Sequence, residues 1–210
     1  MTLRRPAERL GSAVTPRVRP AMSISERVND DVQCMREYFS QLIAFAESFA
    51  KAFAPPSAAG DNTSVYQPLN VTHLVRPDMV CNVYSLLDFW LQELCRYQQQ
   101  HRTLSMTFSD FKKKDKSRTS DLERYRKYIS NIAGVDLRAV HPSFKSLDVL
   151  REVRIAFIHR GGHAKEKRIR ELVTKTPGIS LETTLIVVSD RYIFESLDHA
   201  SQFMQAIAQA

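Results

Sequence analysis

Two side chains in the second half of the chain, Arg154 and His159, have the types and the spacing that could act on phosphate. Histidine titrates near neutrality, which suits His159 to act as a general acid or base. Arginine carries a fixed charge and a fork of N–H donors that match phosphate oxygens, so Arg154 could stabilise a transition state. Together they could cleave RNA without a metal, by assisting attack of the 2′-hydroxyl and departure of the 5′-oxygen.

Arg154 stands at an unusual place in its predicted helix, residues 144–159. Burying an unpaired charge costs roughly several kcal/mol. Either a carboxylate such as Asp88 or Glu93 therefore pairs with Arg154, or the helix face that carries Arg154 lines a functional site. A single Arg and His supply less than the whole mechanism, and a second copy across a two-fold axis would complete it. The apolar arc from which Arg154 projects consists of Leu147, Leu150, Val153, Phe157 and Ile158.

His159 is predicted at the C-terminal end of the same helix, about 140° round from Arg154. Gly161 or Gly162 can adopt the left-handed conformation that ends a helix. The imidazole would then lie beside the last carbonyls. His159 and His163 also form the HxxxH spacing of zinc sites, but the two glycines interrupt the helix and no third ligand stands nearby, so no metal site is expected.

The segment that joins these residues resembles the signature of the HEPN superfamily of small helical ribonucleases. In the sequence, Leu-Arg-Glu-Val precedes an Arg-x4-His motif, and Arg-Gly-Gly follows it. The resemblance implies a mainly α, HEPN-like bundle of four to six helices with a short C-terminal β-hairpin. It implies a homodimer in which Arg154 and His159 of both copies meet in one cleft and act as a metal-independent, cofactor-free RNA endonuclease.

The same resemblance implies a toxin–antitoxin or antiviral defence setting, with an antitoxin or operon partner protein. Some members are silenced by modification of a Tyr two residues after the motif His, and Gly161 stands at that place here. Active members commonly carry Asn directly after the motif Arg, where this chain has Ile155. An alternative is therefore a catalytically inactive HEPN-like module that binds RNA, a nucleotide or a protein. A third possibility is a helical dimerisation protein in which Arg154 makes a structural ion pair.

Several basic side chains are candidates for contact with the RNA backbone. Arg160 and the amides of Gly161 and Gly162 would extend the motif. Basic groups of this kind are more commonly just a solvated surface. The other candidates are Lys112, Lys113 and Lys114 in a predicted connection, and Lys165, Lys167 and Arg168 in a short basic helix.

The composition suits a single soluble domain with a mild positive charge. The net charge is +7, of which +4 falls in the first 21 residues, so the body is not a general coater of nucleic acid. Three cysteines without CxxC spacing predict reduced thiols in the cytoplasm. No apolar run reaches transmembrane length, and no membrane partner is expected. No Walker A, GxGxxG or GxSxG motif is present, which disfavours nucleotide hydrolysis, dinucleotide redox and serine hydrolase chemistry.

The remaining patterns predict the elements around the motif. Residues 1–21 predict a disordered basic tail, and 22–210 a single HEPN-like domain. Ser23 and Glu26 predict a capping box for a helix that ends at Pro55. Residues 55–77 predict a loop, and Asp78 is predicted to cap a central helix to about residue 100. Further helices are predicted over 120–134 and 197–207, with a strand over 179–187 that turns at residues 189–190 into a second strand over 191–194.

Overall fold

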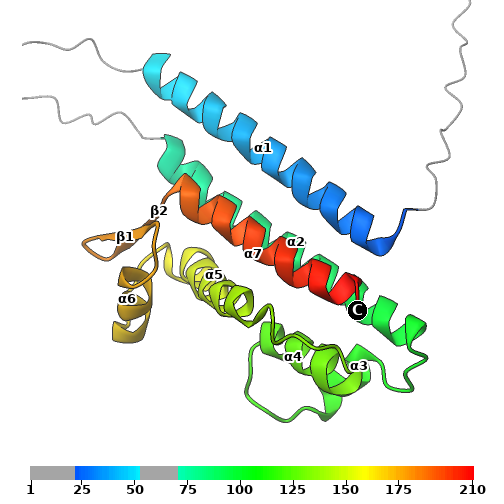
Figure 1. The fold of residues 1–210 in the computed structure, drawn as a ribbon. Coiled ribbons are helices and arrows are strands. Elements are labelled where there is room, and N and C mark those ends of the chain that lie inside the picture. Colours follow the sequence, from blue (N-terminus) through cyan, green and yellow to red (C-terminus); the bar gives the residue numbers. More distant parts are fainter. Residues whose placement is uncertain (1–21, 53–70) are drawn as a thin grey trace, which may run out of the picture.

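The computed structural model describes residues 22–52 and 71–210, so the predicted basic tail and most of the predicted 55–77 loop lie outside the described residues. Three long helices lie side by side, with α1 running opposite to α2 and α7, and α5 packs beneath them (Figure 1). The helices are α1 (Ile24–Ala52), α2 (Val71–His101), α3 (Phe108–Lys114), α4 (Asp121–Lys127), α5 (His141–Arg160), α6 (Lys167–Thr174) and α7 (Asp190–Ala208). The strands are β1 (Ile179–Glu182) and β2 (Leu185–Val188).

The core forms where α2, α5 and α7 meet, and it fixes the orientation of the motif helix. Leu147, Leu150 and Val153 of α5 are fully buried. The predicted apolar arc is therefore confirmed over its first turns, whereas Phe157 is only half-buried and Ile158 is 48% exposed. The mainly α fold with a short C-terminal hairpin is also confirmed. Within the described residues, no helix has both the length and the apolarity needed to cross a membrane.

The first helix begins as predicted. The Ser23 backbone N–H donates to Glu26 Oε2 at 2.7 Å, and the Glu26 N–H donates to Ser23 Oγ at 3.2 Å. This reciprocal pair is a capping box, which satisfies N–H groups that a helix start leaves without partners.

The start of α2 was predicted wrongly. The helix begins at Val71 and not after Asp78, so that Pro77 lies inside it. Proline removes one helical hydrogen bond, and the residue before it makes a tertiary contact with α7. Arg76 donates from Nε to Asp190 Oδ1 at 2.8 Å and from Nη2 to Asp190 Oδ2 at 2.9 Å, which joins this turn to the start of α7.

The region between α2 and α5 also differs from the prediction. Lys112, Lys113 and Lys114 do not lie in an open connection but form the last turn of α3, whose N-terminus is capped by Thr107. The predicted helix after Ser120 is present, with Ser120 Oγ accepting from the Glu123 N–H at 3.2 Å. Its second half, Tyr128–Ile132, is a π-helical turn. Gly134 ends it with φ of +69°.

The hairpin turns earlier than predicted. Its turn is Thr183-Thr184, with Thr183 at φ +60°, and β1 pairs antiparallel with β2 from Ile179↔Val188 to Glu182↔Leu185. Residues 191–194, predicted as a strand, belong to α7 because Ser189 caps that helix by accepting from the Tyr192 N–H at 3.2 Å. Ile179 and Leu181 before the turn and Leu185 and Val187 after it share one two-residue spacing, so the period does not reveal the turn.

We expect Gly178→Ala to destabilise the fold by about 2 to 4 kcal/mol, because two penalties combine at this position. Gly178 has φ of +77°, and an added Cβ would lie 2.8 Å from Ser189 Oγ and 2.9 Å from Tyr192 Cβ. The matched control is Gly134→Ala, which has a similar φ of +69° but no atom within 4 Å of the new Cβ. Chemical denaturation should show the control losing only about 1 kcal/mol. Equal losses in the two variants would contradict this packing.

Candidate functional site

Arg154 points from α5 toward α2, where it meets an aromatic ring. Its guanidinium carbon lies 4.9 Å from the centre of the Tyr84 ring, a cation–π distance. The side chain is half-buried, and its Nε is buried without a hydrogen-bond partner in the described part of the chain. The guanidinium is therefore held by packing against a ring, and its donors are not consumed by the fold.

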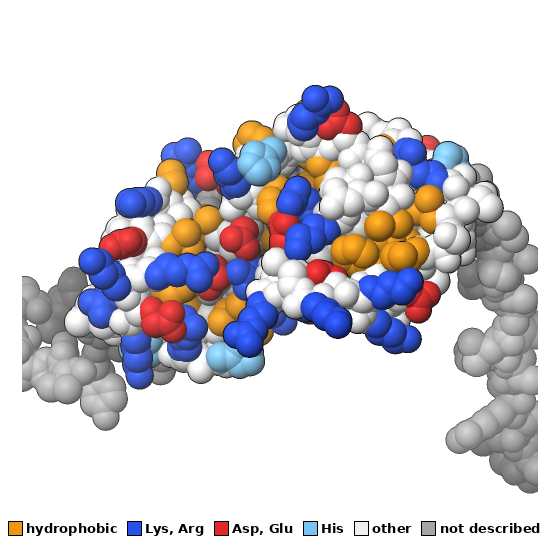
Figure 2. Space-filling view, turned by 90° about the horizontal axis from the view of Figure 1, so that it is seen from below, with side chains coloured by type: hydrophobic (Ala, Val, Ile, Leu, Met, Phe, Trp, Pro, Cys, Tyr) orange, Lys and Arg blue, Asp and Glu red, His pale blue; other side chains and the backbone are white. Residues whose placement is uncertain are grey.

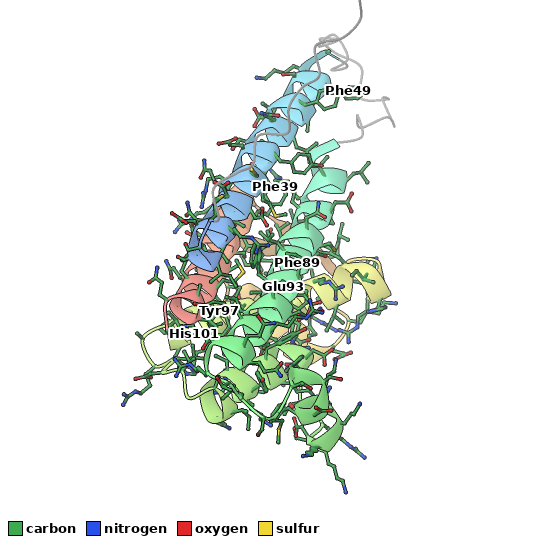
Figure 3. All side chains as sticks on the ribbon, turned by 90° about the vertical axis from the view of Figure 1, so that its right-hand side faces the viewer. Phe39, Phe49, Phe89, Glu93, Tyr97 and His101 are labelled. Carbon is green, nitrogen blue, oxygen red and sulfur yellow. The ribbon has the colours of Figure 1, made fainter. Side chains whose placement is uncertain are left out.

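Neither carboxylate considered as a partner for Arg154 pairs with it. Asp88 Oδ2 accepts from Gln92 Nε2 at 3.1 Å, and Glu93 pairs with Arg96. Figure 3 shows Glu93 in a row with other side chains spaced by four residues along α2, Phe89, Tyr97 and His101. Glu93 is nine residues from Tyr84, which is about 180° round a helix, so it faces away from Arg154. The structural ion pair is thus not formed among the residues described.

An ion-pair network lies beside Arg154 on α5. Glu152 is buried, and its Oε1 accepts from Arg151 Nη2 at 2.7 Å and from Arg168 Nη2 at 3.1 Å. Arg151 also donates from Nε to Asp148 Oδ1 at 3.0 Å. These bonds tie α6 to α5 one turn from Arg154, and they leave Arg154 outside the network.

Charged side chains of three helices, α2, α4 and α5, influence the pKa of the Tyr84 hydroxyl. Burial raises its pKa to about 12, the Asp88 carboxylate adds to this rise, and the cations Arg151 and Arg154 oppose it. Asp121 at the start of α4 also contributes a smaller rise. The Tyr84 hydroxyl therefore stays protonated at neutral pH, where it is available as a hydrogen-bond donor.

Lys112 approaches this site through Asp121. Lys112 Nζ lies 3.2 Å from Asp121 Oδ1, and Arg124 Nη1 lies 3.0 Å from the same oxygen. Burial would raise the pKa of Asp121, but the bonds from these two cations outweigh it and hold the pKa below its ordinary value. Of the three α3 lysines, Lys112 is thus the one that pairs with Asp121, a carboxylate that influences the pKa of Tyr84.

The helix ends as predicted at the two glycines. Gly161 has φ of +58°, and the Gly162 N–H donates to Ala156 O at 3.0 Å. Gly162 O then accepts from the Ile186 N–H at 2.8 Å, which joins the helix end to β2. His159 is exposed in the last turn, five residues and about 7.5 Å along the axis from Arg154.

A cavity of about 360 Å³ adjoins this helix end. Its walls are mainly apolar, and Leu74, one of them, is 61% exposed. Gly162 cannot take a side chain freely, since an added Cβ would lie 3.2 Å from both Leu185 and Phe157. The walls come from the start of α2 (Leu74, Arg76, Pro77), the end of α5 (Phe157, Gly161, Gly162) and the strand β2.

The predicted RNA-contacting residues do not form one basic surface. Figure 2 shows Lys and Arg side chains spread over the face below α5, interleaved with acidic and apolar ones. Several are already engaged. Arg160 Nη2 lies 2.9 Å from Glu166, Lys167 Nζ 3.8 Å from Glu171, Lys113 Nζ 4.0 Å from Asp110, and Arg168 joins Glu152. Lys114 and Lys165 form no side-chain ion pair with the described residues.

His163 serves a structural contact. Its Nδ1 lies 2.9 Å from Thr184 Oγ1, and residue 163 forms a β-bridge with Leu185. Within residues 22–52 and 71–210, no group of three or more His, Cys, Asp or Glu side chains could hold a metal ion. The three cysteines, Cys34, Cys81 and Cys95, are all described and all free.

Tyr84, Arg151 and Glu152 are components of this site that the sequence interpretation did not identify. Arg151 had a detectable signal, because it lies three residues before Arg154 and therefore on a neighbouring part of the same helix face. Glu152 gave a weaker signal as a carboxylate among buried neighbours. Tyr84 had none, since a tyrosine on a largely apolar helix is typical of an ordinary core position.

Comparisons with known proteins add no family to this geometry. No model of a known protein family matches the chain, and neither the curated proteins nor the solved structures contain a significant match. Support for a function therefore comes from the chemistry of the side chains around Arg154 and from the resemblance of the motif.

We expect Arg154→Gln to slow the alkylation of Cys81. Burial raises the pKa of the Cys81 thiol, and the charge of Arg154 opposes that rise. Removing the cation should therefore raise the pKa further and lower the thiolate fraction, which is the reactive form. Peptide mass spectrometry after iodoacetamide treatment would follow Cys81 separately from the exposed Cys34.

The experiment measures how the alkylation rate of Cys81 depends on pH. Its matched control is Arg154→Lys, which keeps the positive charge and should therefore keep the wild-type pH dependence. An unchanged profile in Arg154→Gln would show that the guanidinium does not act on Cys81.

Proposed function

We propose that this protein is a metal-independent RNA endonuclease of the HEPN type, working as a homodimer. The observation that carries the proposal is the Arg154 guanidinium, held over the Tyr84 ring with no carboxylate partner in the described residues. A cation left in this state gains from any anion that reaches it, and a phosphate diester is such an anion. In this mechanism Arg154 stabilises the phosphorane, and His159 moves the proton.

The second copy supplies what one copy lacks. Within one chain, Arg154 faces α2 while the exposed His159 stands in the last turn of α5, about 140° away round the helix. A two-fold axis beside α5 would bring the His159 of each copy toward the Arg154 of the other. Apolar side chains exposed near this end of α5, Ile158 at 48% and Leu74 at 61%, support a contact there.

Toxin–antitoxin or defence activity, with an antitoxin or operon partner, remains part of the proposal through the motif resemblance alone. The alternative is an inactive HEPN-like module that binds RNA without cutting it. Ile155 after the motif Arg favours this alternative, and so do the existing pairs of Arg160 with Glu166 and of Arg168 with Glu152. Cleavage and binding assays on the same RNA separate the two functions.

We expect purified protein to cut RNA in excess EDTA and to leave cyclic phosphate ends. Arg154→Ala and His159→Ala should each lose at least about a hundredfold in rate, the usual scale for a general acid–base group or a transition-state donor. Matched controls are Arg138→Ala and His101→Ala, which remove exposed residues at other places in the fold. RNA binding without cutting would support the inactive module, and equal cutting by all four variants would contradict the assigned residues.

We expect Ile158→Asp to weaken the dimer by at least roughly tenfold, because a charge would replace an apolar side chain in the contact. Sedimentation equilibrium would measure the association, and RNA cutting should fall in parallel. The control is Tyr38→Asp on α1, since Tyr38 is 52% exposed and α1 lies on the other side of α2 and α7 (Figure 1). A wild-type protein that cuts RNA as a monomer would contradict the shared site.

A further inference from the structure

A second cleft lies beside α5, lined on its other sides by α7 and the turn between α6 and β1. Its volume is about 360 Å³, within the usual range for a small-molecule site. None of the residues around Arg154 or Tyr84 lines it. The lining residues are Lys145, Ser146 and Val149 of α5, Lys175, Thr176 and Pro177 of the turn, and Tyr192, Glu195, Ser196 and His199 of α7.

Two cations at this cleft have no partner. Lys145 and Lys175 are both exposed, and neither makes a side-chain hydrogen bond or ion pair with the described residues. The single carboxylate in the lining, Glu195, is already bound, with its Oε1 accepting from Arg191 Nε at 2.7 Å. The cleft therefore has an excess of positive charge that no group of the described residues compensates.

One hydroxyl at the same cleft also lacks an acceptor, whereas Thr176 Oγ1 donates to Leu172 O at 2.8 Å and Ser146 Oγ donates to Pro142 O at 3.3 Å. The Tyr192 hydroxyl is buried, forms no hydrogen bond of normal geometry and lies beside Ser196. Burial raises the pKa of Tyr192, so its hydroxyl remains a donor at all physiological pH values. Buried hydroxyls in folded proteins nearly always have a partner, and one without a partner indicates a missing acceptor.

His199 adds a ring whose second nitrogen is unused. Its Nδ1 lies 3.4 Å from Ser143 Oγ, and that hydroxyl donates to Gln202 Oε1 at 2.8 Å. Ser143 therefore accepts from His199, which places the ring proton on Nδ1. Nε2 has no partner among the described residues.

From this set we infer that the cleft between α5, α7 and the α6–β1 turn binds the phosphate group of a small molecule no larger than a nucleotide. Two lysines supply the charge, and the Tyr192 hydroxyl of α7 supplies a directional donor. The volume of about 360 Å³ suits a small ligand better than an RNA chain, which needs an extended groove. This site is independent of the proposed RNA cleavage.

Calorimetric titration of the full chain with inorganic phosphate and with adenosine monophosphate would test the inference. We expect saturable binding of at least one of these probes. Lys145→Ala/Lys175→Ala should weaken it by at least about tenfold, because each substitution removes a charged hydrogen bond. The matched control, Lys165→Ala/Lys167→Ala, removes the same charge from the start of α6 and the residues just before it, and should change affinity by less than about twofold.

A second measurement needs no variant. Acetylation of lysines in the wild-type protein, followed by mass spectrometry, should show Lys145 and Lys175 protected by the bound probe while Lys165 and Lys167 react as before. The inference would be overturned by the absence of saturable binding, by equal protection of all four lysines, or by protection that only a single-stranded RNA produces.

Discussion

The contact of the Arg154 guanidinium with the Tyr84 ring is the interaction on which the functional interpretation depends. A cation half-buried between two helices needs compensation, which a carboxylate would normally supply. Here an aromatic ring supplies part of it, at a guanidinium-to-centroid distance of 4.9 Å. A ring stabilises a cation less than an ion pair does, but it leaves the N–H donors free. The site is therefore able to bind an anion without first breaking an internal bond.

Packing on both sides of α5 fixes that contact. Leu147, Leu150 and Val153 are fully buried and set the rotation of the helix, which determines that Arg154 faces α2. The two glycines at the C-terminal end of α5 set the length of the helix. Gly162 lies close to Phe157 and Leu185, and its carbonyl accepts a hydrogen bond from β2. The hairpin is thus more than a connection, since it holds the last turn that carries His159.

Local signals predicted the elements well where the chemistry lies within a few residues. The Ser23–Glu26 capping box and the stop at Gly161 are of this kind, and both are present. Predictions failed where a distant contact overrides a local preference. Asp78 was predicted to cap the central helix, but the helix already begins at Val71, and Arg76 in its early turns bonds to Asp190 more than a hundred residues away. The position of Arg154 was predictable from its helix face, whereas its partner Tyr84 was not, because the register of α2 against α5 is set by packing.

The distribution of paired charges shows why two separate places on α5 have unsatisfied cations. Residues 141–175 contain nine Lys and Arg but only four Asp and Glu, so some cations must remain unpaired. Each of the four acids is engaged: Asp148 with Arg151, Glu152 with Arg151 and Arg168, Glu166 with Arg160, and Glu171 with Lys167. Of the five cations left over, Arg154 faces α2, and Lys145 and Lys175 line the cleft at α7. The other two are Lys165 and Arg170, and Arg170 donates to the Lys165 carbonyl. Surface pairs of this kind contribute little to stability, so their consequence is mainly that three of the remaining charges lie at these two places.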